Sequence, residues 1–305
     1  MAIYVQTNVS SLNAQGNLTS ATNSLDVIYE RLSSGLRINS AKDDAAGLQI
    51  VDRLTCQIEG LSQGNRNAND AIGLAQTMEG ALDETTTMLQ RIRTLAVQSA
   101  NGVYTDTDRE AIQQEVTQLC QEITRIACKT TYAGEQCLAG ADHGIIGSSG
   151  KIVFQVGAYA YDTISISMSC GFTLSGIAMI AGLSSLLVDG TSSCFLVNNE
   201  TGNFVFSVST ADLAEMTIGT IDELINAVDS KRAELGAVET RLESTISNQS
   251  NTSENVTDAR SRIRDTDFAE ETSNLTSQTI IQEASTTILT QANQRPQIAL
   301  TLLQS

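Results

Sequence analysis

Both ends of the chain combine almost no charge with the residue spacing of packed helices. Residues 1–25 contain no Asp, Glu, Lys or Arg, and residues 272–305 contain only Glu283 and Arg295. Apolar residues here recur three and four positions apart, which places them on one side of a helix. The seam defined by this spacing comprises Leu18, Leu25, Ile28 and Leu32 near the N-terminus and Ile281, Ala284, Ile288 and Ala292 near the C-terminus. A monomer normally solvates the rest of such helices with charge, so these ends predict surfaces that an assembly buries.

The composition excludes several classes of function. The net charge of −17 opposes binding to nucleic acid and to anionic membranes, because both carry negative charge. No segment reaches the roughly 18–20 apolar residues that a membrane-spanning helix needs. The N-terminus also lacks the basic region and apolar run of a cleaved secretory signal. We therefore expect neither nucleic-acid binding nor membrane insertion.

Two kinds of periodicity divide the chain into helical and β-rich parts. Helical spacing covers residues 57–100, 112–126 and 221–246, and strand patterns cover residues 152–156, 164–168 and 195–208. Thr107 with Glu110, and Thr220 with Glu223, match capping boxes and predict two helix starts. The predicted fold class is mainly α with a β-rich middle.

This pattern predicts a nested organisation. The N- and C-terminal helices, residues 1–45 and 265–305, are expected to pair as a coiled coil or helical bundle. Residues 46–140 and 217–264 are expected to form a helical bundle around them. Residues 141–216 are expected to form a small, exposed β-hairpin region.

Neither a metal site nor a catalytic set is predicted. His143 is the only histidine, so the chain has no HExxH motif and no group of His and Cys at metal-ligand spacing. We expect no cofactor and no enzymatic activity. The six cysteines form no Cys-x-x-Cys pair, and their even number permits disulfides without requiring them. Free thiols and disulfides within or between subunits therefore remain alternatives for Cys56, Cys120, Cys128, Cys137, Cys170 and Cys194.

Several long motifs occur in a fixed order near both ends. They are ERLSSGLRINSAKDDAAGLQ at residues 30–49, RNAND at 66–70, LQRIRTLAVQSANG at 89–102, FQVG at 154–157, LGAV at 235–238, ARSRI at 259–263 and ANQ at 292–294. With these motifs the chain resembles the bacterial flagellins over about residues 1–140 and 217–305.

The resemblance implies a subunit that self-assembles into the extracellular flagellar filament for swimming motility. In such a filament the terminal helices would form an inner tube, the bundle a surrounding shell and the middle the outer surface. The resemblance also implies export of the unfolded chain by the flagellar type III system, without a cleaved signal peptide. The implied partners are further copies of the chain, other flagellins, an export chaperone, and the cap and hook-junction proteins.

Four positions match the region of flagellins that contacts an innate immune receptor. The resemblance implies that Gln90, Arg91, Leu95 and Glu115 lie in or near a contact with a Toll-like receptor of the host. The alternative is that Leu95 packs in the bundle while Arg91 and Glu115 form a solvated or inter-subunit pair. Two other functions also remain alternatives, a hook-filament junction protein and a secreted binding or immune-modulating protein that forms no filament.

Overall fold

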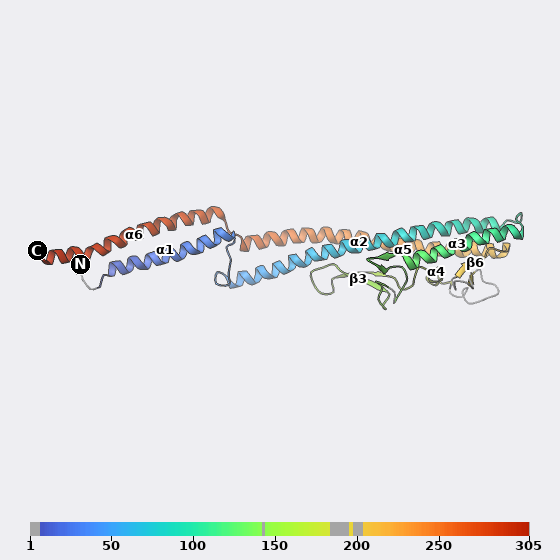
Figure 1. The fold of residues 1–305 in the computed structure, drawn as a ribbon, viewed down its shortest axis with the longest axis horizontal. Helices are drawn as coiled ribbons and strands as arrows, with labels where there is room; N and C mark the ends of the chain where they lie inside the picture. Colours follow the sequence, from blue (N-terminus) through green and yellow to red (C-terminus); the bar gives the residue numbers. More distant parts are fainter. Residues whose placement is uncertain (1–6, 142–143, 184–194, 198–203, 305) are drawn as a thin grey trace. The chain divides into compact units, whose positions relative to one another are not determined.

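The computed structural model describes residues 7–141, 144–183, 195–197 and 204–304 (Figure 1). The helices are α1 (Val9–Ser34), α2 (Ala45–Ala100), α3 (Asp106–Lys129), α4 (Leu174–Ile180), α5 (Ala211–Arg264) and α6 (Phe268–Gln304). The strands are β1 (Thr131–Tyr132), β2 (Glu135–Gln136), β3 (Lys151–Gln155), β4 (Thr163–Ser167), β5 (Phe195–Val197) and β6 (Phe204–Phe206). The predicted fold class, mainly α with a β-rich middle, is confirmed.

The chain divides into two units, which we describe separately. The terminal unit comprises residues 1–58 and 252–305, and the central unit comprises residues 59–251. Helices α2 and α5 each contribute residues to both units.

In the terminal unit, α1 and α6 lie side by side and run antiparallel (Figure 1). The side chain of Asn8 holds the start of α1 in two ways, because its Oδ1 accepts a hydrogen bond from the Ser11 amide and its Nδ2 donates to the Ala292 carbonyl at 2.7 Å. Gly35 ends α1 with φ of 72°, a left-handed conformation that glycine adopts without strain. The predicted pairing of the first and last segments is therefore confirmed.

The two breaks between long helices also lie together in the terminal unit. Leu36 and Asp265 form an antiparallel bridge, and the Arg37 amide donates to the Arg264 carbonyl at 2.6 Å. Helix α6 then starts with Asp267, whose carboxylate accepts hydrogen bonds from the next free backbone amides. These hydrogen bonds fix the points at which α1 ends and α6 begins.

The central unit is a bundle of α2, α3 and α5 with β-hairpins packed on it (Figure 1). Its fully buried side chains form one core, to which the bundle contributes Met78, Leu82, Leu89, Ile92, Val116, Ile123, Leu224 and Val228 and the hairpins contribute Ile152, Ile164, Ile166 and Phe206. Strands β3 and β4 pair antiparallel, with Ile152 opposite Ile166 and Phe154 opposite Ile164. The predicted strand alternation therefore places its apolar residues against the bundle.

Both predicted capping boxes are wrong. Helix α3 begins two residues earlier than expected, where the Thr105 side chain accepts from the Asp108 amide and the Asp108 carboxylate accepts from the Thr105 amide. Thr220 and Glu223 lie inside α5, where the Thr220 hydroxyl donates to the Met216 carbonyl. A Thr-x-x-Glu spacing also occurs within a continuous helix, so the motif alone does not mark a start.

The loop between β3 and β4 packs closely on α2 through glycines. A Cβ at Gly64 would overlap the Val156 carbonyl oxygen, and a Cβ at Gly60 would lie 2.8 Å from the Cβ of Ala158. The Val156 carbonyl also accepts a hydrogen bond from Gln249 Nε2 of α5 at 2.7 Å. The loop therefore links α2 to α5 through its backbone.

We predict opposite effects for two glycine substitutions in α2. Gly64→Ala should lower the free energy of unfolding by about 1–3 kcal/mol, because the new methyl group must displace the Val156 carbonyl. Gly80→Ala should raise it by about 0.5–1 kcal/mol, because no atom lies within 4 Å of the new methyl and alanine favours the helix. Denaturant unfolding of the monomer, followed by circular dichroism, measures both. Equal effects of the two substitutions would contradict the close packing at Gly64.

Candidate self-assembly surfaces

The side of α1 that faces α6 carries the N-terminal seam. Leu25 and Ile28 are buried at 4 % and 7 % exposure, and Leu18 and Leu32 are half-buried. Ala14 and Ala21 are buried on the same side of the helix. These side chains follow the three-four spacing that keeps one face of a helix against its partner.

The covered side of α6 is mostly polar. Most of its buried or half-buried residues follow four-three spacing, namely Glu271, Leu275, Gln278, Gln282, Ser285, Leu289 and Ala292, and Thr279 and Pro296 are half-buried as well. Arg31 of α1 lies 3.5 Å from the buried carboxylate of Glu271. The hydrophobic gain from this pairing is therefore small compared with that of a Leu-rich coiled coil.

The C-terminal seam lies mostly outside the covered side of α6. Ile281 and Ile288 are 43 % and 56 % exposed, and Ala284 is exposed as well. Ile280, which the sequence pattern did not single out, is 61 % exposed. Of the four predicted residues only Ala292 is buried, at 5 %. We call the set Ile280, Ile281, Ala284 and Ile288 the outward face of α6.

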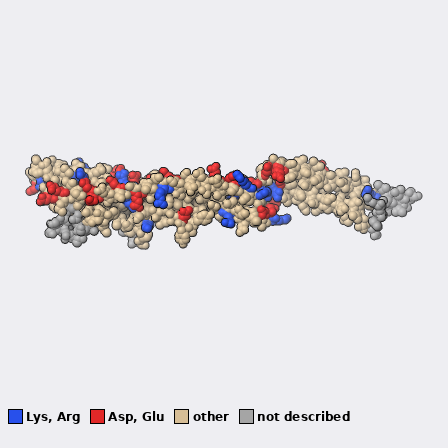
Figure 2. Space-filling view, turned by 180° about the vertical axis from the view of Figure 1, so that it is seen from behind, with Lys and Arg blue, Asp and Glu red and all other residues tan. Residues whose placement is uncertain are grey.

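Six threonines of α6 satisfy their hydroxyl groups within the helix. Each donates a hydrogen bond to a backbone carbonyl three or four residues earlier, at Thr272, Thr276, Thr279, Thr286, Thr287 and Thr290. A hydroxyl bonded in this way can be covered by another surface without losing its donor contact. In Figure 2 the charged side chains of the terminal unit gather around the helix breaks, and few appear over the part of the helix pair nearer the chain ends. The surface of α6 is thus polar in composition but inexpensive to desolvate.

Three of the four residues matched to a receptor contact lie on the bundle surface. Arg91 Nε and Nη2 donate to Glu115 Oε1 at 2.9 and 2.6 Å, and Gln90 is exposed. Leu95 is 3 % exposed and belongs to the bundle core. Only Gln90, Arg91 and Glu115 therefore present side chains to a partner in this conformation.

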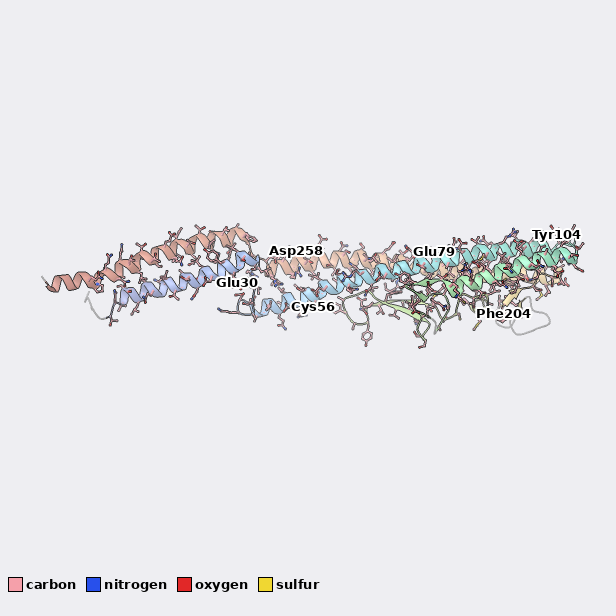
Figure 3. All side chains as sticks on the ribbon, in the orientation of Figure 1. Glu30, Cys56, Glu79, Tyr104, Phe204 and Asp258 are labelled. Carbon is pink, nitrogen blue, oxygen red and sulfur yellow. The ribbon has the colours of Figure 1, made fainter. Side chains whose placement is uncertain are left out.

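The described cysteines are free thiols. Cys56 is exposed on α2 (Figure 3), Cys128 and Cys170 are half-buried, and Cys120 and Cys137 are buried. Burial raises the pKa of the Cys120 thiol to about 12 and also raises the pKa of Cys137, which keeps both protonated and unreactive. Cys194 lies outside the described residues. No disulfide joins the five cysteines that the structure describes.

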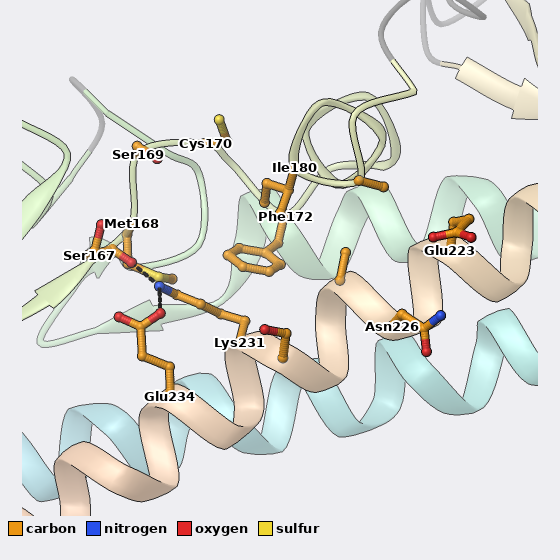
Figure 4. Close-up of a pocket in the computed structure, with 13 residues that line it drawn as sticks. Ser167, Met168, Ser169, Cys170, Phe172, Ile180, Glu223, Asn226, Lys231 and Glu234 are labelled. Atoms are coloured by element: carbon orange, nitrogen blue, oxygen red, sulfur yellow. Dashed lines mark hydrogen bonds and ion pairs between the residues drawn. The ribbon is translucent and has the colours of Figure 1, made fainter.

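A hollow of about 390 Å³ lies between residues 167–172, the end of α4 and α5 in the central unit (Figure 4). Lys231 extends into it from α5, and its ammonium group donates to the Ser167 carbonyl and to Glu234 Oε2. This lysine joins the end of β4 to α5. Among the described residues, no group of three or more His, Cys, Asp or Glu could hold a metal ion. The described helices also include none with the length and apolar content needed to cross a membrane.

Comparisons with known proteins match the same helical regions. The model of the bacterial flagellin N-terminal helical region matches residues 5–143, and that of the bacterial flagellin C-terminal helical region matches residues 218–303. The chain belongs to the bacterial flagellin family. It is therefore a structural subunit of the extracellular flagellar filament and not an enzyme.

Individual relatives are similar along the whole chain. Polar flagellin F of Vibrio parahaemolyticus is 37 % identical over 383 residues, covering 99 % of this flagellin and 100 % of the relative. Flagellin D of Vibrio cholerae is 39 % identical over 376 residues, with the same coverage. A solved flagellar hook-associated protein from Vibrio parahaemolyticus, 16 % identical, shares the fold with a TM-score of 0.56 over 73 % of this chain and 100 % of that one. Both alignments to flagellins are longer than the 305 residues of this chain, so the relatives contain residues without a counterpart here.

We predict that the polar face of α6 limits the stability of its pairing with α1. Gln278→Leu should stabilise the helix pair of the monomer by about 1 kcal/mol, because it adds apolar surface on the side that α1 covers. Gln291→Leu makes the same chemical change at an exposed position of α6 and should leave the pair unchanged. Hydrogen exchange of the α1 amides measures the difference. Equal protection in both variants would contradict the assignment of the covered face.

A second prediction concerns the acidic surface of the bundle. Burial raises the pKa of Glu239, and the carboxylates of Glu79 and Glu243 raise it further. A raised carboxyl pKa in the folded state means that stability is present at low pH and is lost as the pH rises through that pKa. Glu239→Gln should therefore raise the melting temperature at about pH 7 and have little effect at about pH 4, near the ordinary pKa of a glutamate.

The matched control for Glu239 is Glu122. A hydrogen bond from Arg125 lowers the pKa of Glu122, so this carboxylate contributes stability above its unfolded pKa that is lost as the pH falls through the folded value. Glu122→Gln should therefore not raise the melting temperature at about pH 7. A gain from Glu239→Gln that is independent of pH would contradict the electrostatic cause.

Proposed function

We propose that copies of this flagellin associate through the outward face of α6. The observation that carries the proposal is that three isoleucines of α6 are 43–61 % exposed, while glutamine and serine occupy the side facing α1. Exposed apolar surface of this kind marks an interaction site in a soluble protein. Burial of the outward face against neighbouring subunits would supply the apolar contact that α1 does not make.

The distribution of charge supports association at the chain ends. Each copy carries a net charge of −17, so contacts between the charged parts of two copies are opposed by repulsion. Residues 1–25 carry none of this charge, and in residues 272–305 the opposite charges of Glu283 and Arg295 cancel. The internally bonded threonine hydroxyls of α6 lower the desolvation cost of contact further.

We propose a radial order for the filament subunit. Residues 1–45 and 265–305 form the inner tube, residues 46–140 and 217–264 form the surrounding shell, and residues 141–216 form the outer surface. The family models support this order because they match the chain on both sides of residues 144–217 and leave that middle segment out.

Export of the unfolded chain by the flagellar type III system is part of the proposal. Free thiols at the described cysteines fit this route, because no disulfide among them has to form before the chain passes a narrow channel. The export chaperone and the cap and hook-junction proteins are the partners that this route requires. Contact of Gln90, Arg91 and Glu115 with a Toll-like receptor remains a separate proposal, favoured only by their exposure.

Seeded growth separates the filament subunit from the alternatives. Purified monomer is added to short filament fragments and examined by electron microscopy. A filament subunit produces long helical filaments from this chain alone. A hook-filament junction protein, or a secreted protein that forms no filament, would fail to elongate at every salt concentration tested.

We predict that Ile288→Asp abolishes this growth. The substitution places a charge in the outward face, and association of two copies would have to remove water from that charge. It also removes an apolar side chain whose burial contributes about 2–3 kcal/mol. The monomer should keep its helical circular dichroism, because Ile288 is 56 % exposed. Ile288→Val retains the apolar character and should elongate like the unmodified chain. Normal filaments from Ile288→Asp would show that the outward face is not the contact.

A further inference from the structure

The loop between β3 and β4 is held firmly at its base. Gln155 Nε2 donates to the Gly157 and Tyr159 carbonyls at 3.0 and 2.6 Å. The Val156 and Gly157 amides both donate to the Asp162 carbonyl. From α2, on which the loop packs, Asn67 Nδ2 donates to the Gln155 carbonyl at 2.8 Å. Together with the close packing at Gly60 and Gly64, these bonds fix the backbone of the loop on the bundle.

This fixed loop displays two tyrosines to solvent. Tyr159 is 67 % exposed and Tyr161 is 96 % exposed. Tyr161 has φ of 68°, and Ala133 is the only other described residue besides glycine with a positive φ. A bulky residue in the left-handed region is strained. Contacts within the subunit do not compensate for this strain, because almost none of the Tyr161 side chain is covered by other residues.

We propose that Tyr159 and Tyr161 form a contact with a second copy of this chain in the filament. This inference rests on the proposed function and adds a contact site in the central unit. Residues 152–161 contain no charged side chain, and the exposed Asp162 is the only charged residue of the loop, so repulsion between this surface and another copy of an acidic chain is small. Tyrosine is enriched at protein interfaces because its ring is large, rigid and able to form hydrogen bonds. The fixed loop also means that little backbone entropy is lost on contact.

Tryptophan fluorescence tests the contact directly. The chain contains no tryptophan, so Tyr161→Trp introduces a single reporter at the proposed site. On seeded polymerisation its emission should shift to shorter wavelength and become less accessible to acrylamide quenching. The control combines Tyr161→Trp with Ile288→Asp in the same buffer, where no filament forms and the emission should stay that of an exposed indole. A filament whose tryptophan remains exposed and quenchable overturns the inference.

Substitutions at Tyr161 separate the contact from the strain. Tyr161→Asn removes the ring and relieves the strain, since asparagine adopts positive φ more readily than tyrosine. It should raise the critical concentration for elongation about fivefold or more, as loss of an aromatic anchor does, without lowering the melting temperature of the monomer. Tyr161→Phe keeps the ring and should elongate normally.

The outcomes distinguish the two levels of the proposal. If the unmodified chain fails to elongate, the proposed function fails. If the unmodified chain elongates and Tyr161→Asn has the same critical concentration, only the inference about the loop is overturned.

Discussion

The stability of the terminal unit is limited by what α6 places against α1. Glu271, Gln278 and Ser285 occupy positions where a stable two-helix pair would carry leucine. The isoleucines of α6 lie outside the covered side and are open to solvent. A pair of helices in this state has little apolar surface to offset the conformational entropy lost on folding. We therefore propose that a further apolar partner completes its stability, and in a filament the available partner is another copy.

The central unit has no such requirement. Its core joins α2, α3, α4, α5 and the hairpins in one set of buried side chains, and ion pairs such as Arg93 with Asp222 lie on its exposed surface. Exposed pairs of this kind add little stability, so the bundle is held mainly by its apolar core. The central unit is thus held by its own contacts, whereas we propose that the terminal unit gains further apolar burial on assembly.

Periodicity predicted the architecture well but not the orientation of α6. The α1 and α6 pairing, the bundle and the two larger hairpins follow from spacing, since apolar side chains must reach a core. For α6 the same rule pointed to Ile281, Ala284 and Ile288 as a seam, and in the monomer these face away from α1. A second stripe on the same helix, with Leu275 and Leu289, contacts α1 instead. The sequence alone does not show which of two apolar stripes with similar spacing contacts α1, because different partners can cover the two stripes.

Local motifs were less informative than periodicity for a related reason. The Thr-x-x-Glu spacing predicted helix starts at Thr107 and Thr220, yet threonine hydroxyls in this chain mostly bond to carbonyls of their own helix. The Thr-x-x-Glu spacing alone therefore does not mark a cap, although Thr105 does cap α3. The same bonding within the helix gives threonine its proposed value on α6. A helix surface rich in threonine stays hydrated in the monomer, and its hydroxyls keep their hydrogen bonds when a neighbouring subunit covers them. The same bonding by threonine that misled the assignment of a helix start at Thr220 is therefore what we propose adapts α6 to burial in a polymer.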